Sequence, residues 1–120
     1  MQRVAELNNH TFNSTGDTIV EGFIEMGQYH DGQPAFIIWD NHHGPYSTPT
    51  VNLADYGIVA DVDHIVLHDD GVYYNIWRDL SALGIIEHHV MPITYGPYAS
   101  RAVRAKLTPS VANLARALRN

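Results

Sequence analysis

Histidines and aspartates are the residues of this sequence with the most evident chemistry. There are eight histidines in 120 residues, and aspartates gather in the middle of the chain. Imidazole nitrogens and carboxylate oxygens both bind metal ions, so His64, His68 and His88, together with nearby aspartates, are candidate ligands of a metal-dependent enzyme. The first two would lie about 13 Å apart if the segment "DHIVLH" forms a strand, too far to share an ion without a third element between them.

Other patterns of catalytic residues are missing from the sequence. The adjacent histidines at 42–43 and 88–89 would point to opposite faces of a strand, and no "HExxH" pattern occurs. The absence of cysteine excludes disulfides, thiolate metal sites and cysteine nucleophiles. No serine lies in a "GxSxG" elbow, and no glycine-rich loop could hold a phosphate. We therefore expect a protein that is not an enzyme and has no cofactor, with the metal-dependent enzyme as the alternative.

The charges are separated along the chain. Residues 4–77 contain eleven acids and no lysine or arginine, whereas residues 100–120 contain five bases and no acid, and the net charge is -6. An acidic region of this kind attracts cationic partners and repels nucleic acid. We expect a protein partner with a basic surface and no direct binding of nucleic acid. The predicted contact residues are Asp55, Asp61, Asp63, Asp69 and Asp70.

The basic C-terminal region permits three other interpretations. Its arginines could neutralise the acids of the same chain, or a homodimer could pair the acidic face of one copy with the basic helices of the other. A small nucleic-acid binder using residues 101–120 is the third possibility. Five bases with few neighbouring aromatic residues form a weak footprint for nucleic acid, so this version is the least favoured.

The first half of the chain has the patterns of β-strands. In residues 18–26 apolar and acidic side chains alternate, which is typical of a half-buried strand: Val20, Ile24 and Met26 on one face, Glu21 and Glu25 on the other. Asp31 and Gly32 suit a tight turn. The nearly continuous apolar run 34–40 predicts a strand that is central or covered on both faces. These segments together predict a hairpin.

The next segments predict further strands and turns. "HHGPYSTPTVNL" contains strand-breaking residues up to Pro45 and regains β-propensity at Thr50 and Val51, which favours a hairpin connection. Residues 64–68 predict a short strand with Ile65 and Leu67 on the face opposite the histidines. Residues 69–71 then form a turn.

A change of hydrophobic period marks a short helix after residue 73. Ile76, Leu80 and Leu83 follow helical spacing, and Gly84 is suited to end the helix. Residues 85–93 predict another strand, which we expect to stop at Pro92.

The last quarter of the chain predicts two helices. Residues 97–107 are expected to form one of them, with Arg101 and Arg104 facing outward. The second follows Thr108 as N-cap and Pro109 as the first helical residue. Its inward stripe comprises Val111, Leu114, Ala115 and Leu118.

This order of elements predicts the α+β class. We expect a single domain, residues 1–120, with a mainly antiparallel sheet, a short central helix and C-terminal helices packed on one face. A composition of 45% hydrophobic and 17% charged residues is typical of a globular protein. No apolar run is long enough for a signal peptide or a membrane span, so we expect a cytoplasmic protein that does not bind membranes.

The strand-turn-strand segment also carries a resemblance. "GQPAFIIWD" followed by "GPYSTPTVNL" resembles the core of an uncharacterised family of small proteins from bacterial plasmids, conjugative elements and phages, over roughly residues 20–70. The tetrapeptide "TVNL" carries most of the similarity, whereas the histidines and the basic C-terminus depart from the family pattern. The resemblance implies an accessory protein of a mobile element without catalytic residues, which could inhibit a host defence or nucleic-acid-processing system by presenting carboxylates where phosphates would bind.

Overall fold

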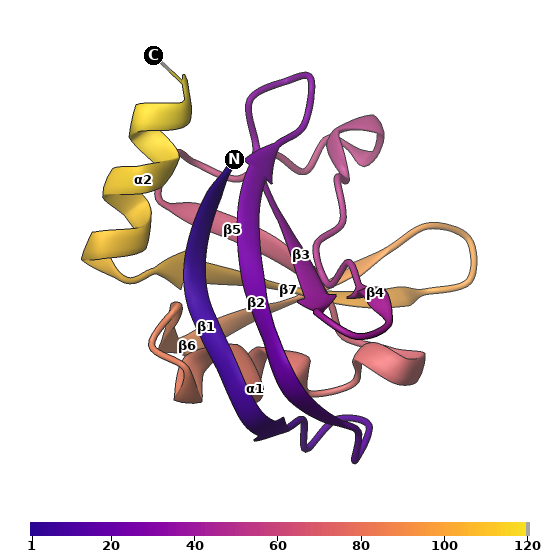
Figure 1. Ribbon diagram of the computed structural model, residues 1–120. Helices are drawn as coiled ribbons and strands as arrows, with labels where there is room; N and C mark the ends of the chain where they lie inside the picture. The colour runs from indigo at the N-terminus through magenta and orange to yellow at the C-terminus, as the bar shows by residue number, and fades with distance from the viewer. Residues whose placement is uncertain (120) are drawn as a thin grey trace.

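The protein folds into two antiparallel β-sheets and two α-helices, and this computed structural model describes residues 1–119 (Figure 1). Sheet A contains, in spatial order, β1 (Gln2–Thr11), β2 (Thr18–Gln28), β3 (Pro34–Asp40) and β4 (Gly44–Ser47). Sheet B contains β5 (His64–His68), β7 (Ser100–Leu107) and β6 (Ile86–Tyr95), with β7 in the middle. The helices are α1 (Ile76–Ala82) and α2 (Pro109–Arg119), and two short 3-10 turns are η1 (Ala54–Tyr56) and η2 (Gly71–Tyr73). The predicted α+β class is confirmed.

The predicted hairpin of residues 18–40 is confirmed as β2 and β3. Its turn is closed by a bond from the Gly32 amide to the Tyr29 carbonyl, and Gly32 has the positive φ of 87° that favours glycine. Strand β3 is central, since it lies between β2 and β4. The predicted alternation in β2 is wrong at one position: Ile19 is buried and Val20 is exposed, although Ile24 and Met26 face the core as expected.

Strand β1 has only a weak hydrophobic pattern in the sequence. It lies at the edge of sheet A, and Leu7 is its one fully buried residue. An edge strand with one buried position lacks the period-2 alternation that identifies a strand by sequence. Strand β1 is defined by its pairing with β2, which the local sequence pattern does not reveal.

The histidine-rich segment after β3 forms the expected hairpin connection. His42 and His43 lie in the turn, and β4 begins immediately afterwards at Gly44. The strand is thus formed by "GPYS", earlier in the chain than the predicted segment around Thr50 and Val51. Thr50 makes only an isolated bridge with Leu67 of β5.

The prediction of a helix over residues 97–107 is wrong, because Ser100–Leu107 is strand β7. The alanines and arginines of "SRAVRAKL" have high helix propensity. In the folded protein this segment pairs on one side with β5 and on the other with β6, and its apolar side chains are buried on both faces of sheet B. Two sets of ladder hydrogen bonds override the local preference, so only one helix follows the strands at the C-terminus.

The remaining predictions for the second half of the chain differ from the structure only in detail. Strand β6 continues through Pro92 to Tyr95, which is possible because β6 is an edge strand and a proline there need not break a ladder bond. Helix α1 ends at Ala82, and Gly84, the glycine expected to terminate it, follows the C-cap Leu83 with φ 76°. The Thr108 hydroxyl donates to the Gly84 carbonyl oxygen at 2.8 Å and so joins the start of α2 to the end of α1.

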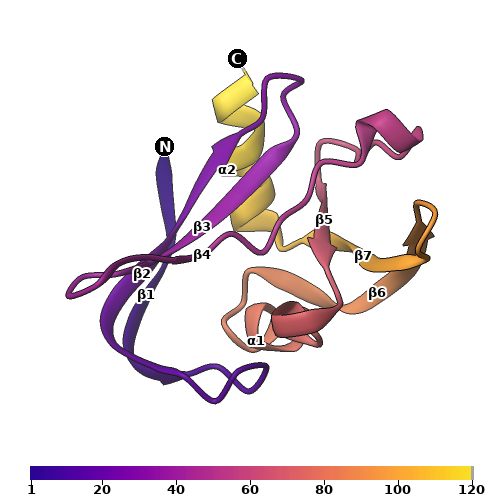
Figure 2. The same cartoon turned by 90° about the vertical axis from the view of Figure 1, so that its right-hand side faces the viewer.

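The two sheets pack against each other with their strands crossing, and the helices close the space between them (Figures 1 and 2). One hydrophobic core contains side chains of both sheets and both helices, among them Phe36, Ile65, Leu80 and Val111. A second, smaller cluster lies on the other face of sheet B, where Leu53 and Ala60 pack on Val66 and Ala102. The loop between β4 and β5 therefore covers part of that face.

Candidate functional site

The outer face of sheet A is open in the part of the chain that the structure describes. Strands β1 to β3 direct alternate side chains to the core, and the intervening side chains point away from it. Figure 2 shows no helix over this side of the sheet. An antiparallel sheet that packs on one face only normally has a polar opposite face. Here the outer face carries an apolar row.

Three half-buried apolar side chains form the centre of this row: Phe23 of β2, and Ile37 and Trp39 of β3. Phe23 and Trp39 are paired across the two strands, with their ring centroids 6.1 Å apart and their planes 20° from parallel. The guanidinium of Arg3 on β1 lies 3.8 Å from the centroid of the Phe23 ring. A cation and two aromatic rings thus lie in line across three strands.

Acidic side chains of β1 and β2 lie beside the apolar row. Glu6 is paired with Phe23, Glu25 with Ile37, and Glu21 lies two residues before Phe23 on the same face of β2. Arg3 approaches Glu6 at 3.4 Å, and both side chains are more than half exposed, so this ion pair neutralises little. Among residues 1–119, neither Glu21 nor Glu25 has an ion pair. The row and these glutamates are here called the outer face of sheet A.

Trp39 has an unpaired polar atom. Its Nε1 is covered by neighbouring atoms and has no hydrogen-bond partner within the described residues. A covered donor without a partner costs about 1–3 kcal/mol. If the indole rotated so that this N–H could donate to an acceptor on another molecule, part of that free-energy cost would be recovered.

The five aspartates predicted as contact residues do not form one patch. Asp55 lies in η1 and Asp61 in the loop before β5, and both are exposed. Asp63 immediately precedes β5, whereas Asp69 and Asp70 follow its other end. A five-residue strand is about 13 Å long between its end residues. The carboxylate of Asp63 therefore lies at one end of β5, and those of Asp69 and Asp70 lie at the other.

Three of these aspartates have bonds within the protein. The Asp69 carboxylate accepts the Asn75 backbone N–H at 2.9 Å, at the start of α1, and that of Asp70 accepts the N–H of Arg101 on β7 at 3.1 Å. Asp63 lies 2.8 Å from His64 Nδ1, and this hydrogen bond lowers the pKa of the carboxyl group below its ordinary value. Their role as contact residues stays a prediction, with Asp55 and Asp61 the most accessible of the five.

The three histidines of the metal hypothesis are not brought together. His64 and His68 occupy opposite ends of β5, while His88 lies on β6 with β7 between the two strands. The His88 ring is bonded to the Ser81 hydroxyl at 2.6 Å. Over residues 1–119 no group of three or more histidine, aspartate or glutamate side chains is arranged to hold a metal ion. The geometry of these ligands does not support the metal-dependent enzyme.

The basic residues expected on two C-terminal helices lie on a strand and a helix. Arg101, Arg104 and Lys106 belong to β7, and Arg116 and Arg119 to α2. Arg104 donates to the Val59 carbonyl oxygen at 3.1 Å, and Arg119 to that of Gly32 at 2.8 Å. In the described part of the chain these cations make no salt bridge to a carboxylate. Arg104 and Arg119 thus bind backbone carbonyl oxygens, and none of the five bases forms an ion pair with an acidic group of sheet A within the described residues.

Sequence reasoning missed the outer face of sheet A, although part of the signal was present. The alternation in residues 18–26 places Phe23 on the same face as Glu21 and Glu25. The run 34–40 was expected to be central or covered on both faces, and only the first of these is the case. The continuous apolar run did not distinguish a central strand with one open face from a strand covered on both faces.

No known family, curated protein or solved structure matches this chain. None of the helices within residues 1–119 is both long and apolar enough to cross a bilayer.

Proposed function

We propose that this protein is a binding module that docks a protein partner with a basic surface on the outer face of sheet A. The observation that supports the proposal is the apolar row of Phe23, Ile37 and Trp39 within a rim of glutamates. Aromatic residues at the centre of an interface, with charged groups at its edge, are the usual composition of a protein-binding surface. The negative charge of the glutamate rim indicates which class of partner it would bind.

Charge complementarity selects a basic partner. Neither Glu21 nor Glu25 forms an ion pair within the described residues, although Arg3 on β1 is the cross-strand partner of Glu25, so lysines or arginines of a partner can approach both. Such pairs at the rim mainly accelerate association and exclude acidic surfaces. The exposed carboxylates of Asp55 and Asp61 extend the negative potential beyond the sheet.

We further propose that the partner is a nucleic-acid-processing or defence enzyme and that the protein is its inhibitor, acting in the cytoplasm on behalf of a mobile element or phage. The groove of such an enzyme is basic because it binds phosphates. An acidic sheet with an aromatic centre could occupy that groove in place of nucleic acid. This step depends on the resemblance of residues 20–70 and on the charge distribution.

The test starts with capture of the partner from the source cells on immobilised protein, followed by titration of the purified partner. Replacing Phe23 with threonine removes the central ring from a strand position that tolerates threonine. Affinity should fall about 30-fold, the effect of losing a central aromatic contact. A second variant, Glu21→Lys with Glu25→Lys, should slow association and weaken its dependence on salt.

Val20→Thr is the matched control, because Val20 lies on the same strand and is 52% exposed. It should bind as the unchanged protein does. Retained affinity in Phe23→Thr, with folding verified by circular dichroism, would contradict the proposal. Sedimentation of the protein alone tests whether a second copy of this chain occupies the outer face of sheet A. If the protein is a dimer and Phe23→Thr dissociates it, the outer face is a homodimer interface and not the docking site of a basic partner.

A further inference from the structure

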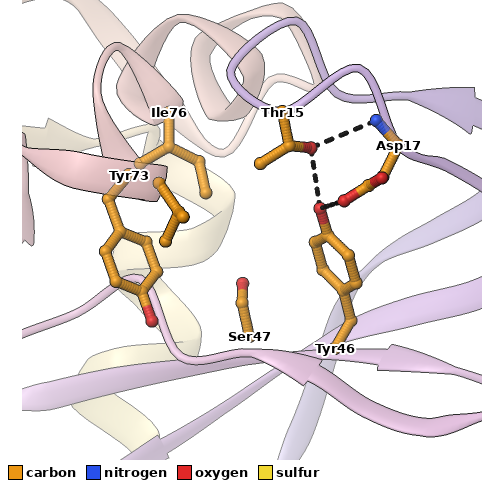
Figure 3. Close-up of a pocket in the computed structure, with 7 residues that line it drawn as sticks. Thr15, Asp17, Tyr46, Ser47, Tyr73 and Ile76 are labelled. Carbon is orange, nitrogen blue, oxygen red and sulfur yellow. Dashed lines mark hydrogen bonds between the residues drawn. The ribbon is translucent and has the colours of Figure 1, made fainter.

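A pocket of about 230 Å³ lies on the side of sheet A that faces the core, between β4 and the start of α1 (Figure 3). Thr15 and Asp17 of the β1–β2 connection form its roof. Tyr46 and Ser47 of β4 form its floor. The pocket is smaller than those that take drug-sized ligands, so any ligand must have only a few heavy atoms.

The polar wall is a chain of hydrogen bonds. The Tyr46 hydroxyl donates to Asp17 Oδ2 at 2.7 Å, and since its single proton is used there, the Thr15 hydroxyl donates to Tyr46 at 2.7 Å. Thr15 in turn accepts the Asp17 backbone N–H at 3.2 Å. Burial and the carboxylates of Asp17 and Asp79 raise the pKa of Tyr46, although the bond from Thr15 lowers it. Tyr46 therefore remains a neutral donor, and the charge of this wall is that of Asp17.

Ser47 supplies the second observation. Its Oγ is buried and has no hydrogen-bond partner within residues 1–119. Figure 3 shows this hydroxyl directed into the space between the rings of Tyr46 and Tyr73. Buried hydroxyl groups are nearly always hydrogen-bonded, so one that points into a pocket is free to bond a polar atom that enters it.

The opposite wall is apolar and carries no positive charge. It is formed by Val72 and Tyr73 of η2 and by Ile76 of α1. The buried Asp79 carboxylate lies behind the roof, where it accepts the backbone N–H groups of Asn13 and Ser14. Two carboxylates and no lining base give the pocket a negative potential.

We propose that this pocket binds a small organic ammonium ion. Its charged nitrogen would donate to the Asp17 carboxylate and the Ser47 hydroxyl, and its hydrocarbon part would lie against Ile76. A charge-assisted hydrogen bond to the carboxylate is stronger than one between neutral groups, which distinguishes an amine from an alcohol of the same size. A carboxylate ligand would be repelled.

Titrations of the isotope-labelled protein with n-butylammonium, n-butanol and butyrate, followed by amide chemical shifts at neutral pH, test the proposal. Butylammonium should produce saturable shifts at Thr15, Asp17, Ser47 and Tyr73. Butanol should bind more weakly and butyrate should not bind. Asp17→Asn should weaken butylammonium binding about tenfold, as expected for the loss of a hydrogen bond to a charged group. Glu21→Gln, which removes the same charge from the outer face of sheet A, should leave it unchanged.

Ser47→Ala separates a ligand contact from a structural role. Removing an unpaired buried hydroxyl should raise the melting temperature, while the affinity for butylammonium should fall. The proposal is overturned if butylammonium and butyrate give equal shifts, if the ammonium shifts spread over the acidic surface without saturating, or if Asp17→Asn binds as tightly as the unchanged protein. Because the pocket and the outer face lie on opposite sides of sheet A, these results are independent of the partner experiment.

Discussion

The buried carboxylate of Asp79 should be one of the most important polar groups for stability. Its side chain lies on α1 and is 2% exposed, and it accepts the Asn13 N–H at 2.9 Å and the Ser14 N–H at 3.3 Å. These two bonds join the β1–β2 connection to a helix 65 residues later in the chain. A carboxylate in the first turn of a helix also interacts favourably with the helix dipole.

Asp79→Ala should lower the free energy of unfolding by about 3 kcal/mol. A hydrogen bond to a charged acceptor contributes about 1.5–3 kcal/mol. The 2.9 Å bond should contribute fully, and the 3.3 Å bond less, because it is close to the limit of hydrogen-bond geometry. At roughly 2 cal/mol/K per residue, the entropy of unfolding of this chain converts that loss into a melting temperature about 12 °C lower.

Urea and thermal unfolding, followed by circular dichroism, measure the effect. The dependence of the unfolding free energy on urea should keep its slope, since the surface exposed on unfolding is nearly the same. Asp55→Ala is the matched control: Asp55 is an exposed carboxylate in the first turn of η1, and its removal should change stability by less than about 0.5 kcal/mol. A loss below about 1 kcal/mol in Asp79→Ala would refute the reasoning that Asp79 anchors this connection.

Three further predictions concern titration and packing. Burial lowers the pKa of His68, so the free energy of unfolding should fall as the pH drops below about 6.5. His68→Phe preserves the stacking on Tyr73 and should make this fall smaller. Urea titrations at pH 7 and pH 5 measure the difference. The pKa of Asp31 is lowered mainly by a hydrogen bond from the Gln33 side chain. The ionised carboxylate therefore stabilises the folded protein above pH 3.8, its ordinary pKa, and this stabilisation is lost as the pH falls through the lowered pKa. Asp31→Asn should be less stable than the unchanged protein at pH 7, and the difference should disappear in strong acid. Gly22→Ala would place a Cβ 2.1 Å from the Trp39 carbonyl oxygen and should lower the free energy of unfolding by about 3 kcal/mol or more. Gly27→Ala is the control, because its Cβ would meet only the flexible end of the Met1 side chain at 3.0 Å, and its effect should be small.

Local patterns predicted those elements whose hydrophobic period is clear. The alternation around β2, the apolar run of β3, the strand β5 and the helical spacing of α1 and α2 each identify an element from a few neighbouring residues. The pattern fails for β1, which lies at an edge and buries little, and for β7, whose alanines favour a helix when considered alone.

The candidate site was less predictable than the fold. The sequence showed that acids dominate residues 4–77, but their distribution in space depends on which strands pair and which ends of the strands they occupy. The Asp70 carboxylate accepts the backbone N–H of Arg101, 31 residues later in the chain, an arrangement that no local pattern contains. The same is true of the histidines, which the strand order of sheet B separates.

The sequence by itself determined the segregation of charge, the absence of cysteine chemistry and the mixture of strands and helices, because composition and local periodicity do not depend on tertiary contacts. Only the tertiary structure decided that β7 is a strand between β5 and β6, that one face of sheet A is left open, and that Ser47 faces a pocket. The physical reason is that the burial and hydrogen bonding of a side chain are set by segments distant in the chain, and their free energy exceeds the small preferences of individual residues.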